Sequence, residues 1–379
     1  MRGERTLFCS NARIFTPGGY MVGGFRVENG LFSGLIPGLT SGGTDLGGAK
    51  VIPGLVDIHI HGAAGEDSSD GDPEGLLIMG RYLASRGVTA FLPTLMSLPE
   101  ENTGRALAAV REAMNRRDST SARILGARME GPFLSEERRG AHNRAFLRVP
   151  DSGIIVRLSG SGGLPVRILD LAPELSGAQE FIRFASGRCR VSLGHTAADY
   201  ETAVSAFDEG ASHVTHLFNA MSPLHHRSPG LIGAAAEREN VTAELICDGV
   251  HIHPSAVRLA FRMFPERLCL VSDAIRCCGL EGGSYDLGGQ SVTVRGGEAH
   301  LADGTLAGAA SDLFTDLSNA VRFGADEETA IRAVTLLPAR VAGCADLVGS
   351  IEAGRRADFL ICGEDLSLRE VYIAGKRIR

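Results

Sequence analysis

The sequence predicts an α/β protein: a (β/α)8 barrel of the TIM type, with a small β-sandwich domain formed from both chain ends. Three observations support this prediction. The chain has 379 residues, which suits one large barrel with an appended module. Eight short apolar runs recur along its centre, and most are followed by a stretch with helical periodicity. The two ends instead carry short alternating segments separated by glycines, which is typical of antiparallel strands.

Both ends of the chain carry the pattern of a small antiparallel β module. The alternating segments lie at 6–15, 23–30, 31–38, 349–363 and 369–379. Chain ends often lie close together at a domain surface, so we expect these segments to pair with one another. The sequence therefore predicts a β-sandwich domain from residues 1–51 and 345–379, beside a barrel domain at 52–344.

Between the ends, the eight apolar runs predict the strands of a parallel barrel. These runs lie at 51–62, 89–95, 123–132, 166–174, 190–196, 213–220, 242–251 and 268–275. The spacing of apolar residues after them predicts the surrounding helices. The predicted helices lie at 74–87, 101–117, 176–186, 199–210, 254–264, 311–323 and 327–342.

Two connections depart from this regular repeat. Residues 221–240 are polar and rich in proline, glycine and histidine, and residues 279–305 have the pattern of a glycine-rich hairpin. Because long irregular loops on a barrel usually shape the active site, we expect both connections to contribute to it.

Composition excludes several classes of protein. Hydrophobic residues make up 44% of the chain and charged residues 22%, and no run approaches the roughly 18 apolar residues of a membrane span. A net charge of −7 without a basic block gives no support to nucleic-acid binding. The eight cysteines lack CxxC spacing, and the first residues lack the features of a signal peptide. We therefore expect a soluble cytoplasmic protein that does not bind membranes.

The segment VDIHIHG at 56–62 places His59 and His61 inside an apolar run. Strand residues two apart point to the same face, so both imidazoles would enter the barrel interior, close enough to reach one metal ion. A lone pair of buried histidines is more often simply hydrogen-bonded. The polar residues at the other strand ends favour a metal site here.

Other predicted strands also end in side chains that bind metals or transfer protons, where a barrel forms its active site. Glu130, His195 and His216 end three runs, and this set resembles catalytic zinc sites that keep one position open for water. A Gly-Pro pair after Glu130 predicts that its strand ends there. Asp273 closes the eighth run and could act as general base and then general acid. The structural alternatives are a salt-bridged carboxylate for Glu130 and a helix cap for Asp273.

Further polar residues in these regions have structural interpretations too. Asp248 precedes a glycine, where aspartate often makes a turn. His213 lies three residues before His216, so strand alternation predicts that it packs against the helices. His251 precedes a predicted helix start, which suits an anion better than a cation. Arg227 lies in the first irregular loop, either on a solvated surface or as the bidentate partner of a phosphate or carboxylate.

Eight motifs occur in order over nearly the whole chain: PGLVDIHIHG, MEGPFLSEERRGAHN, SLGHT, THLFNAM, RSPGLIGAA, CDGVHIH, LVSDAI and GTLAGA. The first motif alone would indicate only an amidohydrolase, whereas EGPF with GAHN, THLFNAM and RSPG is far more specific. Together the motifs resemble the N-acetylglucosamine-6-phosphate deacetylase family of the amidohydrolase superfamily.

This resemblance implies a metal-dependent hydrolase of amino-sugar catabolism, which converts an N-acetylhexosamine 6-phosphate to acetate and the amino sugar phosphate. It implies that Glu130, His195 and His216 hold a divalent metal, zinc foremost, with iron, manganese, cobalt or nickel as other possibilities. It also implies that Asp273 is the catalytic carboxylate and that His142 binds the substrate and polarises its carbonyl. The predicted substrate-binding residues are Ala141, Asn219, Ala220, Arg227, Asp248, His251, Leu306, Ala307 and Gly308.

The resemblance also bears on partners and on the number of ions. In this family the phosphate-binding arginine comes from the neighbouring subunit, which implies a homodimer with Arg227 acting across the interface. Members with His-x-His on the first strand can hold a second metal, whereas members that replace both histidines hold one. His59 and His61 therefore permit one or two ions.

One alternative is disfavoured by the sequence, and two remain. Many amidohydrolases bridge two metals with a carbamylated lysine, but the only lysines are Lys50, before the first barrel strand, and Lys376, in the terminal β module. A deacetylase for N-acetylgalactosamine 6-phosphate, or another metal-dependent N-acyl hydrolase, is the closest competitor. A non-catalytic scaffold is the third alternative, although such a protein would have no need of the candidate ligands.

Overall fold

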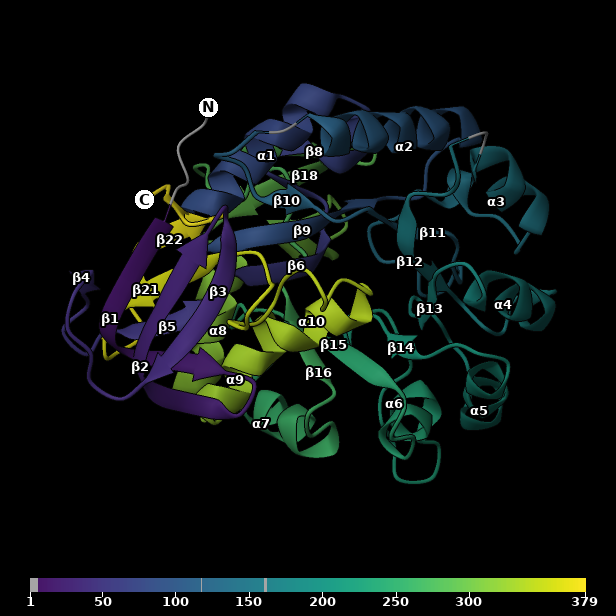
Figure 1. Ribbon diagram of the computed structural model, residues 1–379. Helices are drawn as coiled ribbons and strands as arrows, with labels where there is room; N and C mark the ends of the chain where they lie inside the picture. Colours follow the sequence, from purple (N-terminus) through teal and green to yellow (C-terminus); the bar gives the residue numbers. More distant parts are fainter. Residues whose placement is uncertain (1–5, 117, 160–161) are drawn as a thin grey trace.

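The computed structural model describes residues 6–116, 118–159 and 162–379 (Figure 1). Residues 1–5 of the predicted first domain and residue 117 of the predicted second helix lie outside the described residues. Helices surround a barrel of parallel strands, and the sheet built from the chain ends lies at one side of it (Figure 1). The predicted fold is confirmed.

Eight strands form the barrel, each parallel to its neighbours. In chain order these are β6 (Leu55–Ile60), β9 (Val88–Leu95), β11 (Ala127–Phe133), β12 (Val166–Leu171), β13 (Arg190–Leu193), β14 (His213–Val214), β15 (Thr242–Ile246) and β16 (Leu268–Val271). The barrel closes just beyond β16, where Ile60 forms a parallel bridge with Ala274. The Asp273 amide donates to the His59 carbonyl at 2.9 Å. Closure therefore brings the last strand end beside the first.

The strand that carries Glu130 differs from the prediction. It does not end at the Gly-Pro pair, because β11 continues to Phe133. Its pairing with β12 shifts register between Met129 and Phe133, so the Gly-Pro pair lies within an irregular stretch of the strand rather than after it. A proline lacks the amide that regular pairing needs, which is consistent with this irregularity.

Four of the helices begin at an aspartate cap. The side chains of Asp72, Asp199, Asp312 and Asp326 each accept a hydrogen bond from a backbone amide of the first turn. The helices are α1 (Pro73–Ser85), α2 (Glu100–Asn115), α3 (Ser152–Ser159), α4 (Ala178–Ser186), α5 (Tyr200–Asp208), α6 (Gly230–Ala236), α7 (Pro254–Met263), α8 (Leu313–Arg322), α9 (Glu327–Val334) and α10 (Leu336–Val341).

Two helical predictions are corrected. The predicted helix 327–342 is two helices, α9 and α10, which meet at Thr335 with φ −130° and ψ −85°. Pro338 explains the break, because it has no amide to donate to the carbonyl of Val334 and its ring would clash there. The loop at 221–240 also contains the short helix α6, which its glycine content hid from the periodicity.

The two chain ends form one sheet, as expected. Its strand order is β23–β22–β21–β5–β1–β2–β3, and β4 pairs with β1 (Figure 1). The Phe25 and Phe359 rings, on β2 and β21, lie 4.9 Å apart. Strands three positions apart in a flat sheet would be separated by about 14 Å, so the sheet folds over on itself like a sandwich. Its strands are β1 (Thr6–Thr16), β2 (Gly19–Glu28), β3 (Leu31–Pro37), β4 (Thr44–Asp45), β5 (Lys50–Pro53), β21 (Phe359–Cys362), β22 (Leu368–Ile373) and β23 (Lys376–Arg377). The exact domain limits stay a prediction.

A second small sheet confirms the glycine-rich hairpin. It is antiparallel and follows β16 in the chain, with strands β17 (Gly283–Leu287), β18 (Gln290–Arg295), β19 (Glu298–His300) and β20 (Leu306–Ala309). Ala309 forms a parallel bridge with Ala274, which attaches this sheet to the closing edge of the barrel. The short elements are β7 (Gly62–Ala63), β8 (Glu66–Asp67), β10 (Arg123–Ile124), η1 (Ser68–Asp70) and η2 (Arg144–Phe146). Among the described helices, none has the length and apolar character that a bilayer crossing requires.

Candidate metal centre

A cavity of about 400 Å³ opens at the carboxyl ends of the barrel strands. Its walls include side chains from separate strand ends and from the loops after them. Among them are His61, Glu130, His142, His195, His216 and Asp273. The barrel thus brings together at one mouth the polar residues that the sequence places far apart.

Five of these side chains, together with His59, form two groups of potential metal ligands. His59, His61 and Asp273 form the first group, and Glu130, His195 and His216 form the second; within each group the ligand atoms lie within 4.8 Å of one another. All six side chains are buried. We call them the first-strand group and the three-strand group.

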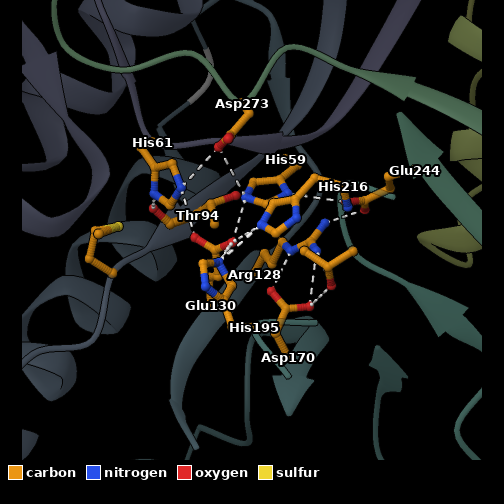
Figure 2. Close-up of polar contacts among 12 residues, drawn as sticks. His59, His61, Thr94, Arg128, Glu130, Asp170, His195, His216, Glu244 and Asp273 are labelled. Atoms are coloured by element: carbon orange, nitrogen blue, oxygen red, sulfur yellow. Dashed lines mark hydrogen bonds and ion pairs between the residues drawn. The ribbon is translucent and has the colours of Figure 1, made fainter. Parts of the chain in front are cut away.

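The Glu130 carboxylate lies between the two groups, and the imidazoles point toward it (Figure 2). Its Oε1 atom lies 3.1 Å from Nε2 of both His195 and His216, and 3.3 Å from Nε2 of His59. Its Oε2 atom lies 3.0 Å from Nε2 of His61. One carboxylate therefore contacts histidines of both groups and could bridge two ions.

Within the first-strand group, Asp273 faces His59 and His61 from the side opposite Glu130 (Figure 2). Its Oδ1 atom lies 3.3 Å from Nε2 of both His59 and His61. Asp273 is 8% exposed, more than the other five ligands. It is therefore the carboxylate of the centre that substrate in the cavity could most readily approach.

Strained backbone turns the side chains of three residues into the cavity. His195, His216 and Asp273 have φ values of 47°, 25° and 47°, a region that residues other than glycine rarely adopt. Such a conformation costs about 1–3 kcal/mol per residue and persists only where the surrounding fold enforces it. All three residues lie just beyond a barrel strand, so the strain falls where the chain leaves the sheet.

The donor set fits a divalent metal. The Nε2 atoms of His195 and His216 face each other at 3.0 Å, and the buried Nε2 of His59 has no hydrogen-bond partner. Convergent imidazole nitrogens around a carboxylate are unfavourable unless a proton or a cation lies among them, and nitrogen and oxygen donors of this kind suit zinc and similar ions. The residues present therefore match the chemistry of a metal centre.

The close approach of these carboxylates and imidazoles also shifts their pKa values in the chain alone, without an ion. Burial would raise the pKa of Glu130, but the imidazoles of His59 and His195 hold it well below its usual range. Burial likewise opposes ionisation of Asp273, yet His59 and His61 bring its pKa to about 2. Burial disfavours protonated His61, but hydrogen bonds to Asp273 and Glu130 raise its pKa to about 9. Both carboxylates are thus ionised at neutral pH and available to a cation.

Burial has the opposite outcome at His142. It lowers the pKa of His142 to about 4, against the attraction of Glu130, so this imidazole is neutral at pH 7. Its Nδ1 lies 2.9 Å from Oγ of Ser97 and its Nε2 lies 3.2 Å from Glu130. A neutral imidazole fixed in this way could donate one hydrogen bond to a substrate oxygen.

A buried polar network beneath the metal centre was not predicted. Arg128, Asp170 and Glu244 are fully buried inside the barrel. Arg128 and Asp170 lie on the side of the centre away from Asp273, and Glu244 lies beside His216 (Figure 2). Arg128 makes two hydrogen bonds of 2.9 Å to Asp170 and one to Glu244. The sequence held one signal: Arg128 lies two residues before Glu130, so both side chains share a strand face.

The interpretation of His213 is wrong. Its side chain does not pack against helices but lies 2.9 Å from Glu244 in the buried network. The alternation argument failed because β14 ends at Val214, and the positive φ of His216 reverses the direction of that side chain. His213 and His216 therefore both face the barrel interior.

Most of the predicted substrate-binding residues lie around the cavity, but three do not. The cavity is lined by Ala141, Asn219, Ala220, His251, Leu306 and Gly308, together with Arg138, Arg139, Met96 and Leu287, which were not predicted. The side chain of Ala307 points away from the cavity and into the core, as strand alternation requires. Asp248 pairs with His251 at 2.7 Å. Arg227 is exposed and contacts His226.

Known proteins match this chain over nearly its full length. The amidohydrolase family profile matches residues 50–378. N-acetylglucosamine-6-phosphate deacetylase from Bacillus subtilis (strain 168) is 39% identical over 320 residues, which cover 83% of this chain and 81% of that protein. N-acetylgalactosamine-6-phosphate deacetylase from Escherichia coli O157:H7 is 32% identical over 353 residues, which cover 93% of both chains.

A solved structure has the same fold over almost every residue. It is a variant of N-acetyl-D-glucosamine-6-phosphate deacetylase from Mycobacterium smegmatis in complex with N-acetyl-D-glucosamine-6-phosphate. The TM-score is 0.92 at 30% identity, and the alignment covers 98% of this chain and 99% of the other. The sequence similarity and the fold similarity thus point to the same set of relatives.

Proposed function

Because this chain belongs to the amidohydrolase family, among the N-acetylglucosamine-6-phosphate deacetylases, we propose that it deacetylates N-acetyl-D-glucosamine 6-phosphate. The products are D-glucosamine 6-phosphate and acetate, and the reaction belongs to amino-sugar catabolism. One observation carries the proposal: Glu130, His195, His216 and Asp273, from four separate strand ends, converge in a cavity large enough for a sugar phosphate. The convergence supplies the residues that amide hydrolysis requires.

The proposed cofactor is one or two divalent ions, with zinc foremost and iron, manganese, cobalt or nickel as alternatives. Glu130, His195 and His216 would hold one ion, and His59 and His61 permit a second. When bound, such an ion supplies Lewis acidity and lowers the pKa of water. Neither lysine lines the cavity, since Lys50 of β5 pairs with Glu327 at the start of α9 and Lys376 lies in β23, so Glu130 is left as the bridge.

We assign proton transfer to Asp273 and carbonyl polarisation to His142. Asp273 is ionised and partly accessible, so it can accept a proton from the attacking water and pass it to the departing amine. Neutral His142 can donate a hydrogen bond to the acetamide oxygen, where negative charge develops. Each role requires the protonation state that the surroundings impose, which is ionised for Asp273 and neutral for His142.

Phosphate recognition in this proposal needs a second copy of the chain. His251 lies in the cavity wall, with Asp248 supporting its ring, and Asn219 and Ala220 line the same cavity. Arg227 is exposed outside its own cavity, on a loop beyond β14. We therefore propose a cytoplasmic homodimer in which Arg227 acts across the interface on the neighbour's cavity.

The test is acetate release at known metal content. Three substrates are compared: N-acetylglucosamine 6-phosphate, its galactosamine epimer, and N-acetylglucosamine without phosphate. We expect the highest kcat/KM with the first and a large loss without phosphate. Failure to release acetate from either phosphorylated sugar at full metal occupancy would refute the proposal, and preference for the galactosamine epimer would change the substrate.

A further inference from the structure

The buried network inside the barrel holds Glu244 beside His59 and His216 (Figure 2). Its Oε1 atom accepts from Arg128 and lies 2.9 Å from Nε2 of His213. Its Oε2 atom lies 3.1 Å from Nδ1 of His59. The other carboxylate, Asp170, is already occupied by two hydrogen bonds from Arg128. One guanidinium therefore serves two carboxylates, and Glu244 retains negative charge that faces His59.

His59 differs from the other candidate ligands in what fixes its far nitrogen. Nδ1 of His61 lies 3.2 Å from the Thr94 carbonyl, and Nδ1 of His195 lies 2.9 Å from the Arg138 carbonyl. Only His59 faces a carboxylate there, among the described ligands. A buried ionised carboxylate attracts a proton far more strongly than a carbonyl does. Glu244 therefore fixes the imidazole of His59 more firmly than the backbone carbonyls fix those of His61 and His195.

The contact decides which nitrogen of His59 can bind a metal. An ionised carboxylate only accepts hydrogen bonds, so the proton of neutral His59 lies on Nδ1 and the lone pair on Nε2. That Nε2 atom is buried without a hydrogen-bond partner, 3.3 Å from both Glu130 and Asp273. Glu244 thus presents the free lone pair of His59 to the ligands of the first-strand group.

We propose that Glu244 is a positioning residue for His59, and that through it the buried network sets the affinity for a second ion at the first-strand group. Arg128 and His213 hold Glu244 in place and so contribute to the orientation of His59. The inference rests on the proposed metal-dependent function but concerns only how the chain holds its second ion. Carboxylates behind histidine ligands typically change metal affinity by about 10- to 100-fold.

Substitution of Glu244 by glutamine tests the proposal with almost no change of shape. Arg128 only donates hydrogen bonds, so the amide oxygen must take the Oε1 position and the amide nitrogen the Oε2 position. That nitrogen would donate to Nδ1 of His59 and drive the ring proton to Nε2. The metal-binding lone pair of His59 would then be lost although every side chain keeps its volume.

The experiment titrates the full metal-free chain with Co²⁺ and follows its visible absorption. We expect the unaltered chain to bind two ions, and Glu244→Gln to bind the first normally and the second about 10- to 100-fold more weakly. Thr215→Val is the matched control, because it removes a hydroxyl of the same network that contacts Arg128 and Asp170 but not Glu244. It should bind both ions as the unaltered chain does.

A double-mutant cycle separates the route through His59 from general damage. Glu244 also accepts from the His216 amide at 3.3 Å, so some effect could bypass His59. In a His59→Asn background, Glu244→Gln should change the remaining affinity by less than about twofold. Equal loss in that background, equal loss in Thr215→Val, or two unaltered affinities in Glu244→Gln would each overturn the proposal. An unaltered chain that binds only one Co²⁺ ion and still releases acetate would overturn it too, while the proposed function would stand.

Discussion

The two groups of potential metal ligands reach the same carboxylate by different routes. The first-strand group takes two of its members, His59 and His61, from positions two apart at the end of β6, where ordinary strand alternation aligns them. The three-strand group joins Glu130 to His195 and His216, which lie 65 and 86 positions further along the chain. His195 and His216 also need strained backbone to turn inward. The first-strand group is therefore specified locally except for Asp273, which barrel closure supplies, whereas the three-strand group depends wholly on the closed barrel.

The largest effect is expected at Glu130, where the two groups meet. Glu130→Gln removes one negative charge that contacts histidines of both groups, so both should bind metal poorly. We expect kcat/KM to fall by about 10⁴-fold, or about 5 kcal/mol. Metal analysis and acetate release measure this, with the exposed Glu136→Gln as control. Full metal occupancy in Glu130→Gln would show that the groups do not share this ligand.

Asp273 tests whether the first-strand group contains the proton-transfer residue. Asp273→Asn keeps the shape but cannot accept a proton at neutral pH, so kcat should fall by about 10²- to 10⁴-fold. The three-strand group should still hold its ion, because Asp273 lies outside it. Metal content and kcat are measured on one preparation. Near-normal turnover with metal bound would remove Asp273 from the chemistry.

A paired substitution compares the groups directly. His195→Asn and His61→Asn each remove one buried imidazole that contacts Glu130. If the three-strand group holds the essential ion, His195→Asn should lower kcat/KM by about 10²-fold and His61→Asn by only about tenfold. Equal losses would mean that both groups hold ions that the reaction needs.

Arg227 lies outside both groups, so its effect should appear in KM rather than in kcat. Arg227→Ala removes a charge-assisted contact of about 1.5–3 kcal/mol, which raises KM for the phosphorylated substrate about 10- to 100-fold. Unphosphorylated substrate is the control and should be unaffected. An unchanged KM would remove Arg227 from phosphate binding.

Subunit mixing tests whether Arg227 acts across an interface. A mixed dimer of Arg227→Ala and Asp273→Asn chains would contain one complete site, made from the intact pocket of one chain and the arginine of the other. In a random equal mixture about one quarter of all sites would be complete. Activity restored to about that level supports the shared site, and no restoration argues that each chain is self-sufficient.

Metal removal, which should abolish acetate release, is expected to have only a small effect on stability. Ions that bind only the folded chain stabilise it by about 2.7 kcal/mol at a free concentration 100 times Kd. Chelation should therefore lower Tm by a few degrees, and His61→Asn, which loses one group, should show part of this shift. Calorimetry measures both. An identical shift in His61→Asn would assign all of the stabilisation to the three-strand group.

The fold and the ligands were predictable because each depends on a strong local pattern. Alternation located His59 and His61, and a polar residue at the end of an apolar run located Glu130, His195 and Asp273. The buried network was not predictable, because Arg128, Asp170 and Glu244 lie within strands and meet only after closure. His213 was misread for a related reason, since a local reversal at His216 cancels the alternation on which the reading relied.

The sheet that joins the chain ends has a consequence for synthesis. β5, at residues 50–53, leaves the ribosome early, yet one of its neighbours is β21, at residues 359–362. The Phe25 ring likewise cannot pack against Phe359 until the end of the chain has been synthesised. During translation, these early strands must stay unpaired on one side while the entire barrel is being made, so this part of the nascent chain is exposed to aggregation for longest and has the greatest need of a chaperone.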